Sequence, residues 1–187
     1  HKAAAERGLQ LLIGTEFRFA NERDPGSRLV LLAQNRAGYG NLSALITLAR
    51  RRSVKGEYRL YRSDFEDPRN HACSSGALPG CLALWIPGPN SSAAEGRWLA
   101  ARFPDRCWLA VELHAGPDDA ARVEILEALG AASGLPLVAA GDVHMHARSR
   151  RPLQDVLAAL RLNTTVAAAG AALFANGERH LRQRCAL

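Results

Sequence analysis

The chain is poor in lysine, has a single methionine, and contains no long apolar run. Only Lys2 and Lys55 are lysine, so arginine carries most of the positive charge behind the net charge of +6. No apolar segment approaches the roughly 20 residues that a membrane-spanning helix needs. The first residues lack the apolar core of a signal peptide. We therefore expect a soluble, cytoplasmic protein, and because its opening histidine stands in what resembles the end of a helix, we expect residue 1 to be a cut.

Cysteine is also sparse, and its spacing excludes two common kinds of site. The four cysteines are Cys73, Cys81, Cys107 and Cys185, and no two of them form a CxxC pair. This spacing predicts reduced, mostly structural thiols rather than a disulfide framework or a thiolate zinc site. The positive charge suits a DNA partner, because basic side chains displace counterions from phosphates. Arginine-rich coding in a GC-rich genome explains the same charge, so both interpretations stay open.

Short apolar runs alternate with longer segments of helical periodicity, as is typical of an α/β protein. Expected strands span residues 9–13, 28–33, 81–86, 107–113 and 136–140, and expected helices span residues 38–52, 93–103, 117–133 and 149–160. A polar loop is expected over residues 53–80, and a further short helix from Asn176. The alternation predicts right-handed βαβ units and a mostly parallel sheet, either open or closed into a barrel.

Carboxylates and imidazoles follow three of the expected strands. Glu16 comes just after the first strand, Glu112 and His114 end the fourth, and Asp142 and His144 follow the fifth. Residues i and i+2 of an extended strand point the same way, and parallel strands gather their carboxyl ends at one face. This donor set suits a divalent zinc, manganese or iron ion. The alternative is a set of polar strand ends satisfied by hydrogen bonds.

Other polar and aromatic residues carry weaker predictions. His146 is a secondary candidate ligand that a turn would direct elsewhere. Arginines that could contact a phosphate backbone are Arg50, Arg51, Arg148, Arg150 and Arg151, with solvated helix ends as the alternative. Trp85 and Trp108 lie in expected strands and are predicted to belong to the core, and Trp98 is predicted to pack within a helix.

Three motifs together resemble a known family. They are Leu12-Ile13-Gly14-Thr15-Glu16-Phe17, the run from Leu31 to Leu42 that contains Asn35-Arg36-Ala37-Gly38-Tyr39-Gly40-Asn41, and Ala140-Gly141-Asp142-Val143-His144-Met145-His146. These runs are similar to the PHP (polymerase and histidinol phosphatase) domain of C-family bacterial DNA polymerases. The segments 148–157 and 175–181 resemble the error-prone branch of that family.

The resemblance implies a distorted (β/α)7 barrel of PHP type that lacks its first strands in this chain. Residues 1–165 would be a partial PHP domain, and residues 166–187 would begin the connection to the polymerase region. Glu16, His114, Asp142 and His144 match family ligands for zinc, manganese or magnesium, whereas Glu112 has no firm family role and stays secondary.

Three departures from the family pattern weaken the implied metal site. The opening His-x-His and Asp-His elements would lie upstream of residue 1. Arg50 stands where metal-competent relatives carry a histidine, and no ligand is evident near strand 81–86. We therefore expect weak metal binding, and an unstable isolated fragment because its sheet edge is unpaired.

For the whole protein the resemblance implies error-prone, translesion DNA synthesis in damage-induced mutagenesis, DNA repair and replication. Its substrates would be DNA and deoxynucleoside triphosphates, its cofactor Mg²⁺, and its partners the sliding clamp and translesion accessory proteins. The nucleotidyltransferase carboxylates would lie beyond Leu187. The alternatives are a stand-alone metal-dependent phosphoesterase, with or without 3′–5′ exonuclease activity, and a non-catalytic scaffold.

Overall fold

The computed structural model describes residues 2–20, 26–66 and 78–183. The chain divides into two compact units. Unit 1 comprises residues 1–110 and 126–138, and unit 2 comprises residues 111–125 and 139–187.

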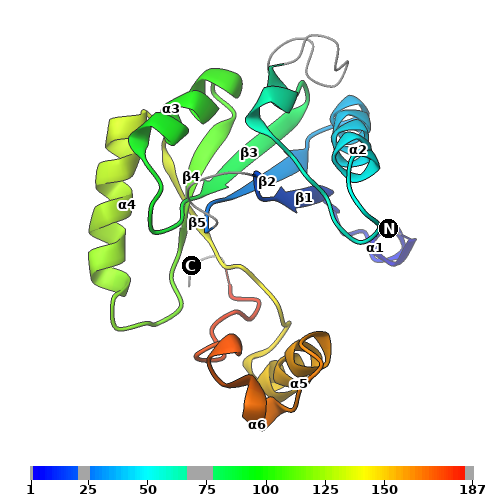
Figure 1. The fold of residues 1–187 in the computed structure, drawn as a ribbon, viewed down its shortest axis with the longest axis vertical. Coiled ribbons are helices and arrows are strands. Elements are labelled where there is room, and N and C mark those ends of the chain that lie inside the picture. Colours follow the sequence, from blue (N-terminus) through cyan, green and yellow to red (C-terminus); the bar gives the residue numbers. More distant parts are fainter. Residues whose placement is uncertain (1, 21–25, 67–77, 184–187) are drawn as a thin grey trace. The chain divides into compact units, whose positions relative to one another are not determined.

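Five strands form one sheet in the order β1-β2-β3-β4-β5 (Figure 1). They are β1 (Gly14–Phe17), β2 (Arg28–Ala33), β3 (Cys81–Ile86), β4 (Cys107–Glu112) and β5 (Leu137–Ala140). β3 pairs parallel to β4, but β1 and β3 each pair antiparallel to β2. The prediction of a mostly parallel sheet is therefore wrong for the first three strands. The connection from β1 to β2 is too short for the helical crossover that parallel neighbours need.

The four main predicted helices are confirmed with small shifts at their ends. The helices are α1 (Lys2–Glu6), α2 (Arg36–Arg51), α3 (Ala93–Arg102), α4 (Asp119–Ser133), α5 (Arg151–Arg161) and α6 (Val166–Ala169). Three 3₁₀ turns complete them: η1 (Arg62–Phe65), η2 (Arg148–Arg150) and η3 (Gly170–Ala172). α4 begins with Asp119, whose carboxylate reaches back and accepts a hydrogen bond from the Gly116 N–H at 3.1 Å, as in the capping box of a helix N-terminus.

Two predicted elements are wrong. Residues 9–13 form no strand; Leu9 and Leu12 are largely exposed, and only the Ile13 carbonyl, accepting from the Ala33 N–H at 2.8 Å, joins the sheet. No helix opens at Asn176 either. Its side-chain oxygen accepts from the Glu178 N–H at 3.0 Å, which makes a turn instead of a helix cap.

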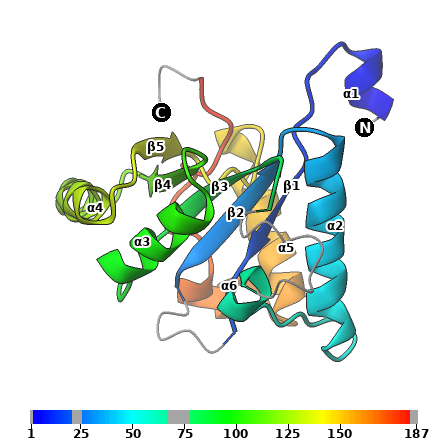
Figure 2. The ribbon, with the colours of Figure 1, turned by 90° about the horizontal axis from the view of Figure 1, so that it is seen from above.

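The core of unit 1 lies on one face of β2 and β3. Leu29 and Trp85 are register partners and are both almost fully buried. α2 packs against these two strands and runs along the sheet (Figure 2). α3 reaches the same face, because Gly96 lies against the Trp85 ring. The prediction that Trp85 belongs to the core is confirmed.

A buried polar network ties this core together. The Ser27 hydroxyl donates to a Glu95 carboxylate oxygen at 2.6 Å and accepts from the Trp85 indole N–H at 3.0 Å. Ser27 and Glu95 are both buried. Such a network is stabilising because each buried polar group has a partner. We call it the Ser27 network.

The start of α2 explains part of the Asn35–Gly40 motif. The Asn35 side chain caps the helix by accepting from the Gly38 N–H at 2.9 Å. Gly38 lies so close to β3 that an added Cβ would be 1.9 Å from the Gly80 carbonyl oxygen. Gly40, on the open side of the same helix, has nothing within 4 Å of such a Cβ. Packing therefore requires a glycine at position 38 but not at position 40.

The described thiols are structural, as predicted. Cys81 and Cys107 are both free and buried, and burial raises the pKa of Cys107 to about 12. Cys73 and Cys185 lie outside the described residues.

In unit 2, α5 packs against α6 and η2. Ala159 is buried, whereas Leu153, Val156, Leu157 and Leu160 leave an apolar stripe exposed. Over residues 2–20, 26–66 and 78–183, no helix has the length and apolarity that a membrane span requires.

Candidate metal centre

Three of the predicted site residues meet in unit 2. One ligand atom each from Glu112, His114 and Asp142 can be chosen so that all three lie within 4.8 Å of one another. Glu112 is the last residue of β4 and is buried, and His114 follows it by two residues. Ligand atoms around a tetrahedral ion at about 2.1 Å are roughly 3.4 Å apart. The cluster therefore has a suitable donor set and would contract slightly around an ion.

His114 has the surroundings of a metal ligand. Both of its ring nitrogens are buried, and neither has a hydrogen-bond partner among the described residues. Burial and the nearby charges of Arg179 and Arg182 lower the pKa of His114 to about 4. The imidazole is therefore neutral at pH 7, which is the form that binds a metal ion. Orphaned buried nitrogens beside two carboxylates fit a divalent ion.

Asp142 lies in an unusual backbone conformation two residues beyond β5. Its φ of +41° is in the left-handed region, which few residues other than glycine adopt. The i, i+2 argument for Asp142 and His144 consequently fails, because this part of the chain is not an extended strand. The two side chains still meet, with His144 Nε2 at 3.2 Å from Asp142 Oδ1.

The second oxygen of Asp142 is also engaged. The Arg179 guanidinium forms an ion pair with Asp142 Oδ2 and lies over the Phe174 ring, 4.5 Å from its centroid. The His144 ring also contacts Phe174, with centroids 4.8 Å apart. Sequence reasoning missed Arg179 and Phe174, since neither stands near a strand end in the sequence.

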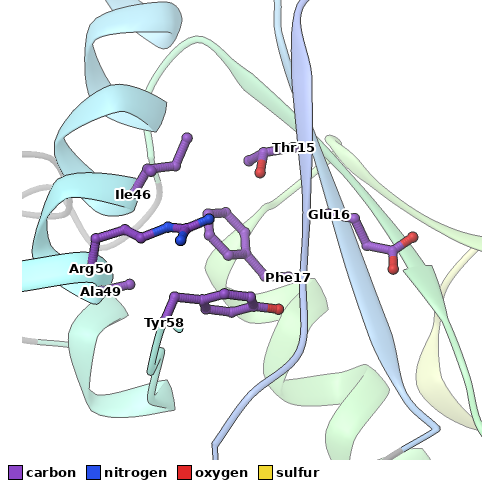
Figure 3. A pocket seen from close by; sticks show the side chains of 7 residues that line it. All are labelled: Thr15, Glu16, Phe17, Ile46, Ala49, Arg50 and Tyr58. Atoms are coloured by element: carbon purple, nitrogen blue, oxygen red, sulfur yellow. The ribbon is translucent and has the colours of Figure 1, made fainter. Parts of the chain in front are cut away.

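Glu16 belongs to unit 1, whereas Glu112, His114 and Asp142 belong to unit 2. It lies within β1, its side chain is 43% exposed, and it pairs with Arg28 at 3.1 Å. Figure 3 shows its carboxylate projecting to the opposite side of β1 from Phe17 and Arg50. The prediction that Glu16 joins the other ligands is untested and stays a prediction.

Arg50 lines a small cavity beside β1 (Figure 3). The cavity has a volume of about 170 Å³, and its lining residues are Thr15, Glu16, Phe17, Ile46, Ala49, Arg50 and Tyr58. Within the described ranges no polar partner is found for the Arg50 guanidinium. A cation here, in the last turn of α2, cannot ligate a metal ion, which agrees with the departure noted in the sequence.

The other arginines predicted to contact nucleic acid fall into two groups. Arg148 pairs with Glu178 at 2.7 Å, and Arg151 pairs with Asp155 at 2.8 Å. Arg51 and Arg150 are exposed. His146 is exposed as well and lies outside the ligand cluster found among the described residues. None of these observations tests a DNA contact.

Comparison with known proteins places the chain in a family. The model of the PHP domain family matches residues 1–106. A protein named error-prone DNA polymerase from Dechloromonas aromatica (strain RCB) is 59% identical over 187 residues, which is 100% of this chain and 17% of the relative. One of the same name from Azoarcus sp. (strain BH72) is 60% identical over 95% of this chain and 16% of its own length.

A third relative, named error-prone DNA polymerase from Pseudomonas fluorescens, is 51% identical over 97% of this chain and 16% of its own length. The chain thus spans about one sixth of the relatives it matches. The family match ends before Glu112, so the ligand cluster rests on the geometry described above. The match over residues 1–106 covers more than half of the chain, which belongs to the PHP domain family.

Proposed function

We propose that this chain is the PHP domain of an error-prone DNA polymerase that copies damaged templates during damage-induced mutagenesis and repair. The observation that carries the proposal is identity of 51–60% with proteins of that name over 95–100% of the chain. The substrates of the whole protein would be DNA and deoxynucleoside triphosphates, with Mg²⁺ as cofactor. The sliding clamp and translesion accessory proteins would be its partners.

The polymerase chemistry would be carried by residues outside this chain. Nucleotidyl transfer needs clustered carboxylates that hold two metal ions against the primer end and the triphosphate. Glu112 and Asp142 are two carboxylates that meet among the described residues, but they share their cluster with His114, and Arg179 pairs with Asp142. We therefore assign this chain a role in support of the polymerase and not in nucleotide addition.

Glu112, His114 and Asp142 would hold one divalent ion, zinc, manganese or magnesium, with His144 beside it. The buried, unpartnered nitrogens of His114 support this part of the proposal. A bound ion would activate water and stabilise charge on a phosphoryl oxygen. The side chains themselves would orient the ion: Glu112 is fixed at the end of β4, and Asp142 by its bond to His144. Residual phosphoesterase or 3′–5′ exonuclease activity would follow.

The finer fold assignment is also a proposal. The five-stranded sheet and its helices are consistent with a PHP-type fold, and we propose that it is part of a distorted (β/α)7 barrel. The domain would cover residues 1–165, with residues 166–187 beginning the connection to the polymerase region.

A non-catalytic scaffold is the second candidate, and the ion pair between Arg179 and Asp142 favours it. A cation already held by a ligand carboxylate reduces the need for a metal ion. The stand-alone phosphoesterase is less well supported, since the relatives reported above all carry a polymerase name.

Primer extension and phosphodiesterase assays on the complete protein test these assignments. We expect Mg²⁺-dependent extension past a template lesion, and loss of 3′-end cleavage but not of extension in an Asp142→Ala, His144→Ala variant. His146→Ala, which alters an exposed histidine outside the cluster, is the matched control. Absence of extension by the wild-type protein would refute the polymerase assignment. Cleavage that persists in the double variant would refute the catalytic metal centre.

A further inference from the structure

The C-terminal part of unit 2 folds back onto the residues that carry the candidate ligands. We call residues 174–182 the cover segment. The carbonyl oxygen of Arg179 accepts from the backbone N–H groups of His144 and Met145 at 2.9 and 3.2 Å, and the Leu181 N–H donates to the Met145 carbonyl at 2.9 Å. The cover segment is thus paired by its backbone with the chain that follows Asp142.

Side chains of the cover segment bind the other half of the cluster. The Asn176 amide donates to the carbonyl oxygen of His114 at 2.6 Å. The Arg182 guanidinium donates to the Leu113 carbonyl at 2.8 Å. Both contacts are to the backbone beside His114, so the segment is anchored on both sides of the site without using the His114 ring.

Arg179 is placed differently, because it contacts a ligand atom. Its guanidinium pairs with Asp142 Oδ2, while Asp142 Oδ1 faces His144 Nε2 at 3.2 Å. Both oxygens of Asp142 therefore have partners. The Phe174 ring beneath the guanidinium stabilises the cation in this position. Each oxygen keeps a free lone pair, so an ion could still reach Asp142, but the positive charge of Arg179 on this carboxylate repels a divalent ion and weakens its binding.

We propose that Arg179 is a built-in competitor of the metal ion, so that a divalent ion and the cover segment exclude each other at Asp142. This inference rests on the proposed metal centre. Arg179 neutralises this largely enclosed carboxylate when no ion is bound. When an ion binds, repulsion between the two cations at one carboxylate drives Arg179 away, and the cover segment loses its contact with Asp142.

The coupling is reciprocal, because any effect of the cover segment on metal affinity equals the effect of the metal on the segment. The charge-assisted pair between Arg179 and Asp142 would lower the affinity of the centre for a divalent ion by roughly 10- to 100-fold. The site would consequently be filled only when the ion is abundant or when a partner draws the segment away.

Mn²⁺ titration of the complete protein tests the proposal. The part of the binding signal that a His114→Ala variant loses is assigned to this centre. We expect Arg179→Gln to bind Mn²⁺ roughly 10- to 100-fold more tightly than wild type. Arg122→Gln is the matched control. It removes the same charge near His114, but Arg122 belongs to α4 and not to the cover segment. We expect a change of about 3-fold or less, because neither the cover segment nor Asp142 loses a partner.

Equal gains in Arg179→Gln and Arg122→Gln would overturn the proposal, because they would show a general effect of charge. Equal affinities in wild type and Arg179→Gln would also overturn it while leaving the metal centre intact. If neither protein shows a signal that depends on His114, the metal centre itself fails and the competition fails with it.

Amide hydrogen exchange provides a second readout that leaves Arg179 in place. In the wild type, saturating Mn²⁺ should speed exchange at His144, Met145 and Leu181, whose N–H groups pair across the cover segment. In His114→Ala the same Mn²⁺ concentration should have no effect. Slower or unchanged exchange in the wild type on metal binding would contradict the mutual exclusion.

Discussion

Replacing Gly38 by alanine should destabilise α2, whereas the same replacement at Gly40 should stabilise it. The added Cβ at position 38 would lie 1.9 Å from the Gly80 carbonyl oxygen and 2.6 Å from the carbonyl carbon. Relief of this overlap requires backbone movement of roughly 1.5 Å, judged from ordinary contact distances. Gly80 has little room to yield, because its own φ is +72° and its α-carbon faces the Asn35 side chain.

The expected magnitude follows from two opposing effects. Alanine is favoured over glycine within a helix by roughly 0.8–1 kcal/mol, a gain available in full only at Gly40. Overpacking costs about 1–3 kcal/mol when side chains can adjust, and more when backbone must move. We therefore expect Gly38→Ala to lower the free energy of local unfolding by about 2–3 kcal/mol and Gly40→Ala to raise it by about 0.5–1 kcal/mol.

Amide hydrogen exchange of peptides from α2 and β3 in the complete protein measures both changes. A loss of about 3 kcal/mol corresponds to exchange roughly 150-fold faster at the most protected amides. The Gly40 variant serves as the control for helix propensity, since it makes the same chemical change two residues away. Exchange in Gly38→Ala as slow as in the wild type would refute the close packing of α2 on β3.

Three further predictions concern the core, the thiols and α5. Ser27→Ala removes the shared hydroxyl of the Ser27 network and should cost about 2–4 kcal/mol of unfolding free energy, because a buried indole N–H and a carboxylate each lose a partner; a denaturant midpoint equal to that of the wild type would contradict this. Burial raises the pKa of Cys107 to about 12, so this thiol should resist iodoacetamide at pH 9 in the native protein and react once urea unfolds the chain. Rapid labelling of the native protein, detected by mass spectrometry of the Cys107 peptide, would contradict this. Leu157→Glu on the exposed stripe should change stability by less than about 0.5 kcal/mol, whereas Ala159→Glu at a buried position should cost about 3 kcal/mol or more; similar losses from both would show that the stripe is covered.

Local patterns predicted the helices and most strands because their signals lie within a few residues. α4 follows from the acidic residues at its start, and β3 from a short apolar run between turn residues. The strand predicted over residues 9–13 failed because apolar content alone does not decide pairing. Whether neighbouring strands run parallel or antiparallel could not be predicted from local patterns either, because it depends on which strands lie side by side in the folded sheet.

The meeting of Glu112, His114 and Asp142 was predicted in part for the right reason. Glu112 and His114 follow from the end of β4, and the clustering with Asp142 follows from neighbouring strand ends. Asp142 and His144 meet through a direct contact and a left-handed residue, not through strand alternation. Arg179 could not have been predicted, because it lies 37 residues after Asp142 in the chain. The segment that carries it forms neither a helix nor a long strand, so no local pattern marks its position.

The assignments at this site depend on the proposal that Glu112, His114 and Asp142 form a divalent metal centre. Anomalous diffraction at the manganese edge, from crystals of the complete protein grown with Mn²⁺, tests it most directly. We expect an anomalous peak about 2.0–2.3 Å from a His114 ring nitrogen and from oxygens of Glu112 and Asp142, with Arg179 moved off Asp142. Density in which Arg179 still pairs with Asp142 at saturating Mn²⁺, with no peak beside His114, would contradict it.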